Sequence, residues 1–84
     1  MYEFKQTCAG CPEQYDVYDG DRQVGYVRLR WGALRADAGF CGGDTVYSHD
    51  FGDDLKGMFA DDAERRHYLN EIANALRRHY EKTE

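Results

Sequence analysis

The stretch QVGYVRLRWGALRADA, residues 23–38, decides the fold of this chain. Residues 23–31 alternate with a period of two, which is typical of a strand with one buried side. The side expected to be buried carries Gly25, Val27, Leu29 and Trp31. A turn at residues 31–33 leads into a second alternating run, in which leucine and alanine take every other position of residues 34–38. The two runs therefore predict an antiparallel hairpin.

Weaker strand patterns lie on both sides of this hairpin. Residues 2–6 predict a short strand, residues 8–13 a turn, and residues 14–19 a second alternating strand. After a glycine loop at residues 39–44, residues 45–49 predict another strand. Together with the hairpin, these runs predict an antiparallel β-meander of three to four strands.

The C-terminal part of the chain predicts one amphipathic helix. Asp61, with Glu64 three residues later, matches a capping box, in which both side chains accept backbone N–H groups at a helix start. Apolar side chains then recur at helical spacing, at Leu69, Ile72, Ala73, Leu76 and Tyr80. We therefore expect an α+β fold of the order ββββα, forming a single domain over residues 1–84, with the helix packed on one side of the sheet.

Length and composition narrow the class of protein. A chain of 84 residues buries only about 60–65% of the surface that its unfolded form exposes. A bound metal ion or a second protomer would therefore add to the stability of so small a domain. The first twenty residues lack the basic and apolar regions of a leader, and no apolar run is long enough to span a bilayer. We expect a cytoplasmic protein with no membrane partner. The net charge of −5 argues against general nucleic-acid binding.

The cysteines are candidate metal ligands. Cys8 and Cys11 are spaced as a C-x2-C pair, and Cys41 would add a third ligand to a structural zinc site. The fourth ligand would be His49, Asp44, another acid or a water. The alternative interpretation is a tight turn with free thiols, because cysteine also packs as a small apolar residue. An odd cysteine count favours a reducing compartment. Thiol–disulfide exchange is disfavoured, since Pro12 and a strand follow Cys11 where a redox motif needs a helix N-terminus.

The side of the sheet that the helix leaves uncovered is rich in arginine and tyrosine. One helix covers one side of a four-stranded sheet. Residues 22–36 also carry four arginines and no acid. The uncovered side is expected to present Tyr18, Tyr26, Arg28, Arg30, Arg35 and Tyr47 to water, to a second protomer or to a ligand.

Three functions compete for this arrangement. The first is a non-catalytic module that binds a protein partner, or a second copy of itself, through the arginine and tyrosine side chains, which are enriched in interfaces. The second is a nucleic-acid binder that uses the same side chains for phosphate contacts and base stacking. The third is an acidic inhibitor that imitates nucleic acid through residues 50–62. An enzyme is not expected, because no nucleophile, base and orienting group come together.

Both charged regions also have an ordinary interpretation without a ligand. Arginine and tyrosine suit the solvent side of a strand, where Asp16 and Asp37 are candidates for neutralising pairs. The acids of residues 50–62 do not have the spacing of a calcium loop. They suit a solvated loop before a helix, because negative charge is favourable at a helix N-terminus.

Overall fold

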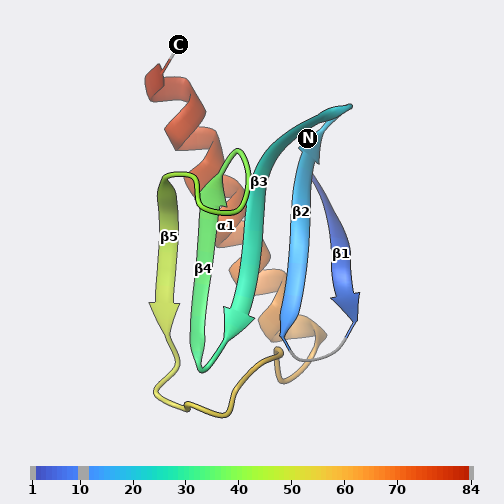
Figure 1. Ribbon diagram of the computed structural model, residues 1–84, viewed down its shortest axis with the longest axis vertical. Coiled ribbons are helices and arrows are strands. Elements are labelled where there is room, and N and C mark those ends of the chain that lie inside the picture. Colours follow the sequence, from blue (N-terminus) through green and yellow to red (C-terminus); the bar gives the residue numbers. More distant parts are fainter. Residues whose placement is uncertain (1, 10–11, 84) are drawn as a thin grey trace.

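The computed structural model describes residues 2–9 and 12–83. This part of the chain forms a five-stranded antiparallel sheet followed by one helix, in the order β1 (Glu3–Ala9), β2 (Glu13–Asp19), β3 (Arg22–Arg30), β4 (Ala33–Ala38), β5 (Thr45–Asp50) and α1 (Asp62–Thr83). Strands that follow one another in sequence lie side by side, so the sheet is a meander (Figure 1). The predicted α+β meander with a C-terminal helix is confirmed, with one strand more than expected.

Helix α1 crosses one side of the sheet diagonally, and no helix of the described residues lies on the opposite side (Figure 1). The core lies between the two layers. Its most deeply buried apolar side chains are Val17, Val27, Leu29, Leu34, Ala36, Ile72 and Leu76. At Gly25 the helix comes so close that a Cβ atom would lie 2.9 Å from Leu76 Cδ1. The core thus occupies the side of the sheet that faces α1.

The helix begins as its sequence predicts. The backbone N–H of Glu64 donates to Asp61 Oδ1 across 2.7 Å, and the N–H of Ala60 donates to Glu64 Oε1 across 3.0 Å. Glu64 also forms an ion pair with Lys56, whose Nζ lies 2.8 Å from Glu64 Oε1. The predicted capping box is therefore confirmed, and it also ties the preceding loop to the helix.

A buried ion pair joins α1 to β2. Glu13, which the sequence placed in a turn, is the first residue of β2 and is only 2% exposed. Arg65 Nε donates to Glu13 Oε2 across 2.7 Å, the N–H of Phe59 donates to Oε1 across 3.1 Å, and the Tyr15 hydroxyl donates as well. Burial alone would raise the pKa of Glu13, but these hydrogen bonds outweigh it and hold the pKa below its ordinary value. Burial and the Glu13 carboxylate raise the pKa of Tyr15 to about 12.

Trp31 and Cys8 do not occupy the places that the sequence predicted. Trp31 is not in the core, because it lies in the turn between β3 and β4 with 67% of its surface exposed. Cys8 is not in a turn but in β1, where it pairs with Gln14 across an irregular register between Gln6 and Cys8. That irregularity interrupts the alternation, which is why the sequence pattern predicts too short a β1.

Tyr47 lies on the side of the sheet that faces α1, so its predicted place on the uncovered side is wrong. It pairs with Ala36, whose side chain is fully buried in the core, and packs against that core itself. Tyr47 stands in the regular part of the β4–β5 ladder, so its side is fixed by its pairing with Ala36. The register shift lies beyond this pair, between Ala36 and Asp37, and allows the neighbouring Val46 to pack against the core as well. The pairing partner of Tyr47 cannot be known from the alternation of β5 alone.

Candidate binding face

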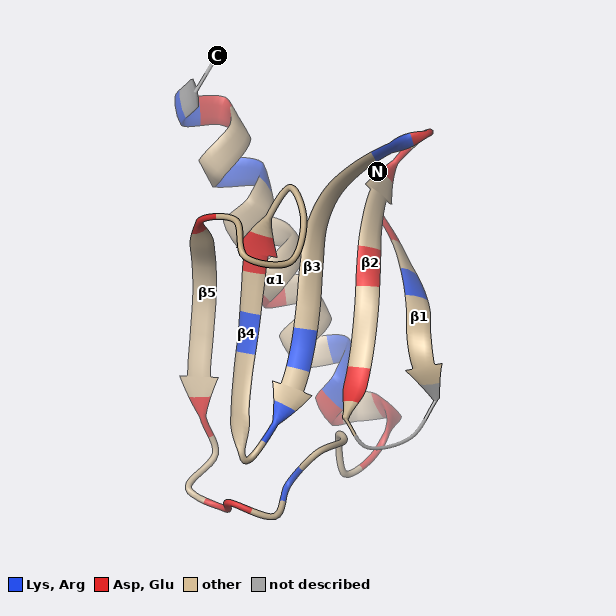
Figure 2. Cartoon of the chain, viewed as in Figure 1, with Lys and Arg blue, Asp and Glu red and all other residues tan. Residues whose placement is uncertain are grey.

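Arg28, Arg30, Arg35, Tyr18 and Tyr26 lie on the side of the sheet that α1 leaves uncovered, and we call this set the arginine face. Residues directly opposite each other in an antiparallel sheet point to the same side. Arg28 of β3 lies opposite Arg35 of β4 on one flank and opposite Gln14 of β2 on the other. Figure 2 shows the blue segments of β3 and β4 side by side, with red segments on β2 and near the end of β4. The structure thus brings these predicted residues together.

The arginines of this face differ in how their charges are compensated. Arg35 Nε donates to Asp37 Oδ1 across 2.9 Å along the same strand. Within the described part of the chain, no carboxylate oxygen lies within 4.0 Å of a side-chain nitrogen of Arg28 or Arg30. The ordinary interpretation, in which acids neutralise the arginines, therefore holds for Arg35 alone of the three.

Asp37 is itself a fixed part of the fold. It is 2% exposed and also accepts hydrogen bonds from Thr45 Oγ1 across 3.0 Å and from the N–H of Gly42 across 3.1 Å. Burial alone would raise the pKa of Asp37, but the hydrogen bonds from Arg35, Gly42 and Thr45 hold it below its ordinary value. This carboxylate is fully engaged and is not available to Arg28.

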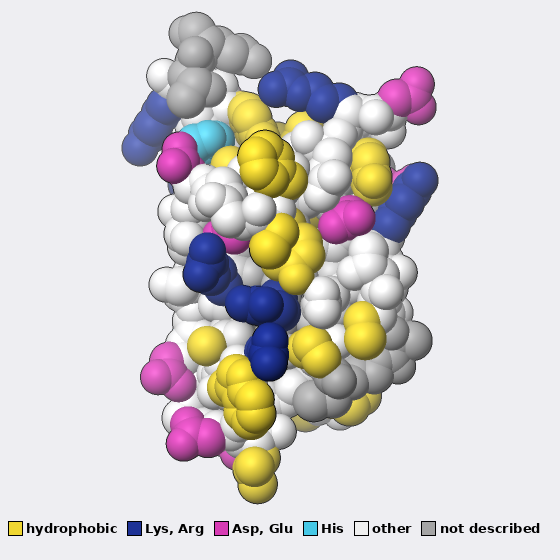
Figure 3. All heavy atoms as spheres, viewed as in Figure 1, with side chains coloured by type: hydrophobic (Ala, Val, Ile, Leu, Met, Phe, Trp, Pro, Cys, Tyr) yellow, Lys and Arg dark blue, Asp and Glu magenta, His cyan; other side chains and the backbone are white. Residues whose placement is uncertain are grey.

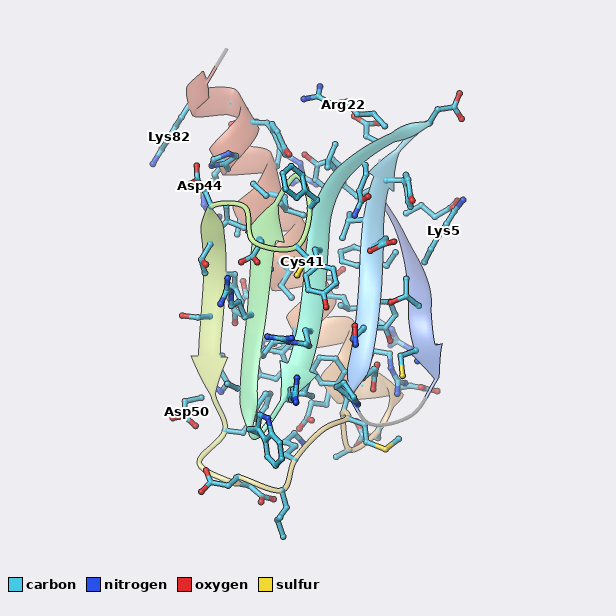
Figure 4. All side chains as sticks on the ribbon, in the orientation of Figure 1. Lys5, Arg22, Cys41, Asp44, Asp50 and Lys82 are labelled. Carbon is cyan, nitrogen blue, oxygen red and sulfur yellow. The ribbon has the colours of Figure 1, made fainter. Side chains whose placement is uncertain are left out.

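The tyrosines border the arginines. The Tyr26 hydroxyl donates to Gln14 Oε1 across 2.9 Å, and burial, followed by the neighbouring Cys41 thiol, raises the pKa of Tyr26. Cys41 belongs to a loop that folds over the uncovered side of the sheet, in front of β3 and β4 (Figure 4). Tyr18 lies further along β2, with Lys5 Nζ 4.9 Å from its ring centre. These rings give the face apolar surface beside its charge.

Trp31 ends the arginine face in a strained turn. Trp31 and Gly32 form the two-residue loop between β3 and β4, with φ angles of 55° and 75°. Two positive φ angles define a type I′ hairpin, which favours asparagine or glycine at the first position. A bulky residue with positive φ is an outlier. The Arg30 guanidinium carbon lies 5.4 Å from the Trp31 ring centre. Sequence reasoning missed this residue, although a tryptophan before a hairpin glycine was the available signal.

The surface beside Trp31 is hollowed into a pocket of about 530 Å³, which we call the Trp31 pocket. Ligand pockets measure about 300–1,000 Å³. Backbone hydrogen bonds join three segments around this pocket. The Gly32 N–H of the β3–β4 turn donates to Lys56 O, in the loop after β5, across 2.8 Å. The Glu13 N–H at the start of β2 donates to Gly57 O of the same loop across 2.7 Å. The pocket is lined by Pro12, Gln14, Arg30, Trp31, Asp54, Leu55 and Gly57.

The structure does not bring Cys41 and His49 together. Cys41 lies on the uncovered side, whereas His49 pairs with Leu34 on the side of α1, where its ring centre is 5.0 Å from that of Tyr68. Cys11 lies outside the described residues. Within residues 2–9 and 12–83, no group of three or more His, Cys, Asp or Glu is placed to hold a metal ion. The zinc hypothesis stays a prediction, centred on the Cys8 and Cys11 pair.

The acids between the last residue of β5 and the start of α1 serve the loop and the helix start. Asp50 Oδ1 accepts the N–H of Gly52 across 2.8 Å, and Asp53 Oδ1 accepts the N–H of Leu55 across 3.0 Å. Asp61 caps the helix. These contacts agree with the ordinary interpretation of a solvated loop before a helix.

No family model, curated protein or solved structure matches this chain. Among the residues that the structure describes, no helix is both long and apolar enough to cross a membrane. A proposal for the function rests on the chemistry of the arginine face and the Trp31 pocket.

Proposed function

We propose that this protein is a small non-catalytic module that binds a carboxylate-bearing segment of a partner protein through the arginine face. The observation that carries the proposal is the pair Arg28 and Arg30, whose guanidinium groups have no carboxylate partner among the described residues. Guanidinium and carboxylate form paired, charge-assisted hydrogen bonds. A bound carboxylate would also relieve the repulsion between Arg28 and the opposite Arg35.

The distribution of charge favours a short acidic segment over nucleic acid. Figure 3 shows a cluster of dark blue groups near the centre of this side, with hydrophobic groups above and below it and further dark blue groups at the edges. Asp16 lies opposite Tyr26, and Asp54 lies at the Trp31 pocket. A nucleic-acid strand extends its phosphates beyond three arginines and would meet these acids, in a protein whose net charge is already −5. A short segment with one or two carboxylates avoids them.

A second candidate function is the binding of single-stranded nucleic acid by the same face. The exposed Trp31 ring beside Arg30 favours it, because bases stack on aromatic rings and phosphates pair with guanidinium. The two candidates differ in salt dependence. Each phosphate contact releases counterions, so the affinity for an oligonucleotide falls steeply with salt.

A selection from a random-peptide display library tests the proposed function even though the partner is unidentified. The wild-type protein is the only target of the selection, and the affinities of the selected peptides are afterwards measured on the wild type and on the double variant Arg28→Glu/Arg30→Glu. The expected result is a set of peptides enriched in Asp and Glu that bind the wild type and lose at least about tenfold in affinity on the double variant, since two attractive contacts become repulsive. Arg78→Glu, an exposed change on the far side, is the matched control and should bind the peptides as the wild type does.

The outcomes separate the candidates. Enrichment of basic peptides would contradict the proposal and favour the acidic inhibitor. A single-stranded oligonucleotide that binds more tightly than any peptide, with a steep loss in salt, would establish the second candidate instead. A wild-type dimer that the double variant converts to monomer would identify a second copy of the chain as the partner.

A further inference from the structure

The Trp31 pocket is continuous with the arginine face. Arg30 belongs to both, and Gln14, which lines the pocket, lies directly opposite Arg28. A segment that places a carboxylate on Arg28 therefore has its neighbouring side chains at the mouth of the pocket.

The lining of the pocket is suited to an apolar side chain. Pro12 and the Trp31 indole are joined by Leu55, which is 88% exposed although it is fully apolar. Gln14, Arg30 and Asp54 add polar atoms to this lining. Apolar walls with a few polar groups are the usual composition of a binding pocket, in which the polar groups orient the ligand.

The backbone around the pocket is held in place before any ligand arrives. A Cβ atom on Gly32 would lie 2.2 Å from Asp53 O, so the loop after β5 packs directly against the β3–β4 turn. The N–H of Phe51 donates to Gly32 O across 2.8 Å and holds the same two segments from the other direction. A preformed pocket loses little conformational freedom on binding.

Trp31 is unfavourable to the fold where it stands. Its backbone has a positive φ of 55°, which disfavours bulky side chains, and its indole is 67% exposed to water. Backbone strain of this kind is found at binding sites, where the surrounding structure imposes it. A ligand that covers the indole would account for a side chain that the turn itself does not need.

We infer that the Trp31 pocket receives one apolar side chain, aromatic or leucine-like, from the same partner segment that places a carboxylate on Arg28. The recognised segment thus carries an acidic residue close to an apolar one. The inference extends the proposed function. Only its statement about the carboxylate on Arg28 rests on that function, and its statement about the apolar side chain in the pocket does not.

Two small probes test the two halves separately. N-acetylphenylalanine amide and N-acetylglutamate amide are titrated into the isotope-labelled protein and followed by NMR. The phenylalanine probe should shift the Trp31 indole N–H and the backbone N–H groups of Leu55 and Gly57. The glutamate probe should shift the guanidinium signals of Arg28 and Arg35. Leu55→Ser should weaken the phenylalanine probe at least about fivefold, because it removes an apolar wall.

Phe40→Ser is the matched control, since Phe40 is also an exposed apolar side chain, at 66%, but does not line the pocket. This change should leave the affinity of the protein for both probes unchanged. If the glutamate probe binds and the phenylalanine probe leaves the pocket signals in place, the inference is wrong and the proposed function stands. If the phenylalanine probe binds and the glutamate probe does not, the pocket is supported and the proposed function fails. Tighter binding of thymidine monophosphate in the pocket would overturn both.

Discussion

Arg28 of β3 lies directly opposite Arg35 of β4, so two like charges face each other across the middle of the sheet. Asp37 compensates Arg35 across 2.9 Å and leaves Arg28 without a carboxylate among the described residues. Like charges in this relationship destabilise a sheet. The proposed binding of a carboxylate accounts for Arg28 better than a role in stability does. Replacing Arg28 should therefore affect binding and stability in opposite directions.

Replacing Arg28 with glutamate should stabilise the fold while it abolishes the binding of acidic peptides. A glutamate opposite Arg35 converts repulsion to attraction and should raise the free energy of unfolding by about 0.2–1 kcal/mol. Urea denaturation measures the change. Arg28→Gln, which removes the repulsion without adding attraction, should give a smaller gain. A loss of stability in both variants would show that Arg28 serves the fold.

Replacing Glu13 with glutamine should destabilise the protein strongly. The change removes the charge of a carboxylate that is 2% exposed and weakens its hydrogen bonds with Arg65 and the N–H of Phe59, and hydrogen bonds to charged groups contribute about 1.5–3 kcal/mol each. Asp62→Asn is the matched control, because Asp62 pairs with the same arginine but its side chain is 88% exposed. It should cost less than about 1 kcal/mol. Equal losses in the two variants, measured by urea denaturation, would rule out the special role of the buried carboxylate.

Stability should be lost in acid. The folded protein lowers the pKa of Glu13 and Asp37 below their ordinary values of 4.5 and 3.8. Each carboxylate therefore contributes to the free energy of unfolding. This contribution is fully present when the pH is above the ordinary pKa, and it disappears as the pH falls through the lowered pKa of the folded protein. The urea midpoint should be constant near neutral pH and fall below about pH 4.5. Asp37→Asn should lower the neutral midpoint and flatten this fall, whereas a midpoint that rises in acid would contradict the assignment.

The hairpin of β3 and β4 could be predicted because a period of two runs through residues 23–38 almost without interruption. The same alternation predicted correctly that Arg28, Arg30 and Arg35 lie on one side of the sheet. The pattern fails at Trp31, one residue past the last pair of the ladder, because turn geometry takes over there. Alternation describes strands and says nothing about where a turn directs its side chains.

The remaining errors arise where the register shifts or where distant segments meet. Register shifts between Gln6 and Cys8, and between Ala36 and Asp37, break the alternation in β1 and β5. The Trp31 pocket joins Pro12, Trp31 and Leu55, which come from three separate loops. Only the folded sheet brings these loops to one end, so no local pattern in the sequence could reveal the pocket.

The central claim is that Trp31 is held in an unfavourable turn because it binds a partner. Trp31→Asn tests the claim most directly, because asparagine suits a type I′ turn. Relief of strain should gain about 1 kcal/mol, and loss of the contact with Arg30 should cost about 0.5 kcal/mol. The net gain of about 0.5 kcal/mol corresponds to a rise in Tm of about 2–4 °C.

The decisive measurement pairs the Tm of Trp31→Asn with the Kd of a peptide from the display selection, both compared with the wild type. The account predicts a higher Tm together with binding at least about tenfold weaker, because a stacked aromatic contact and one wall of the pocket are lost. A lower Tm together with unchanged binding would contradict it.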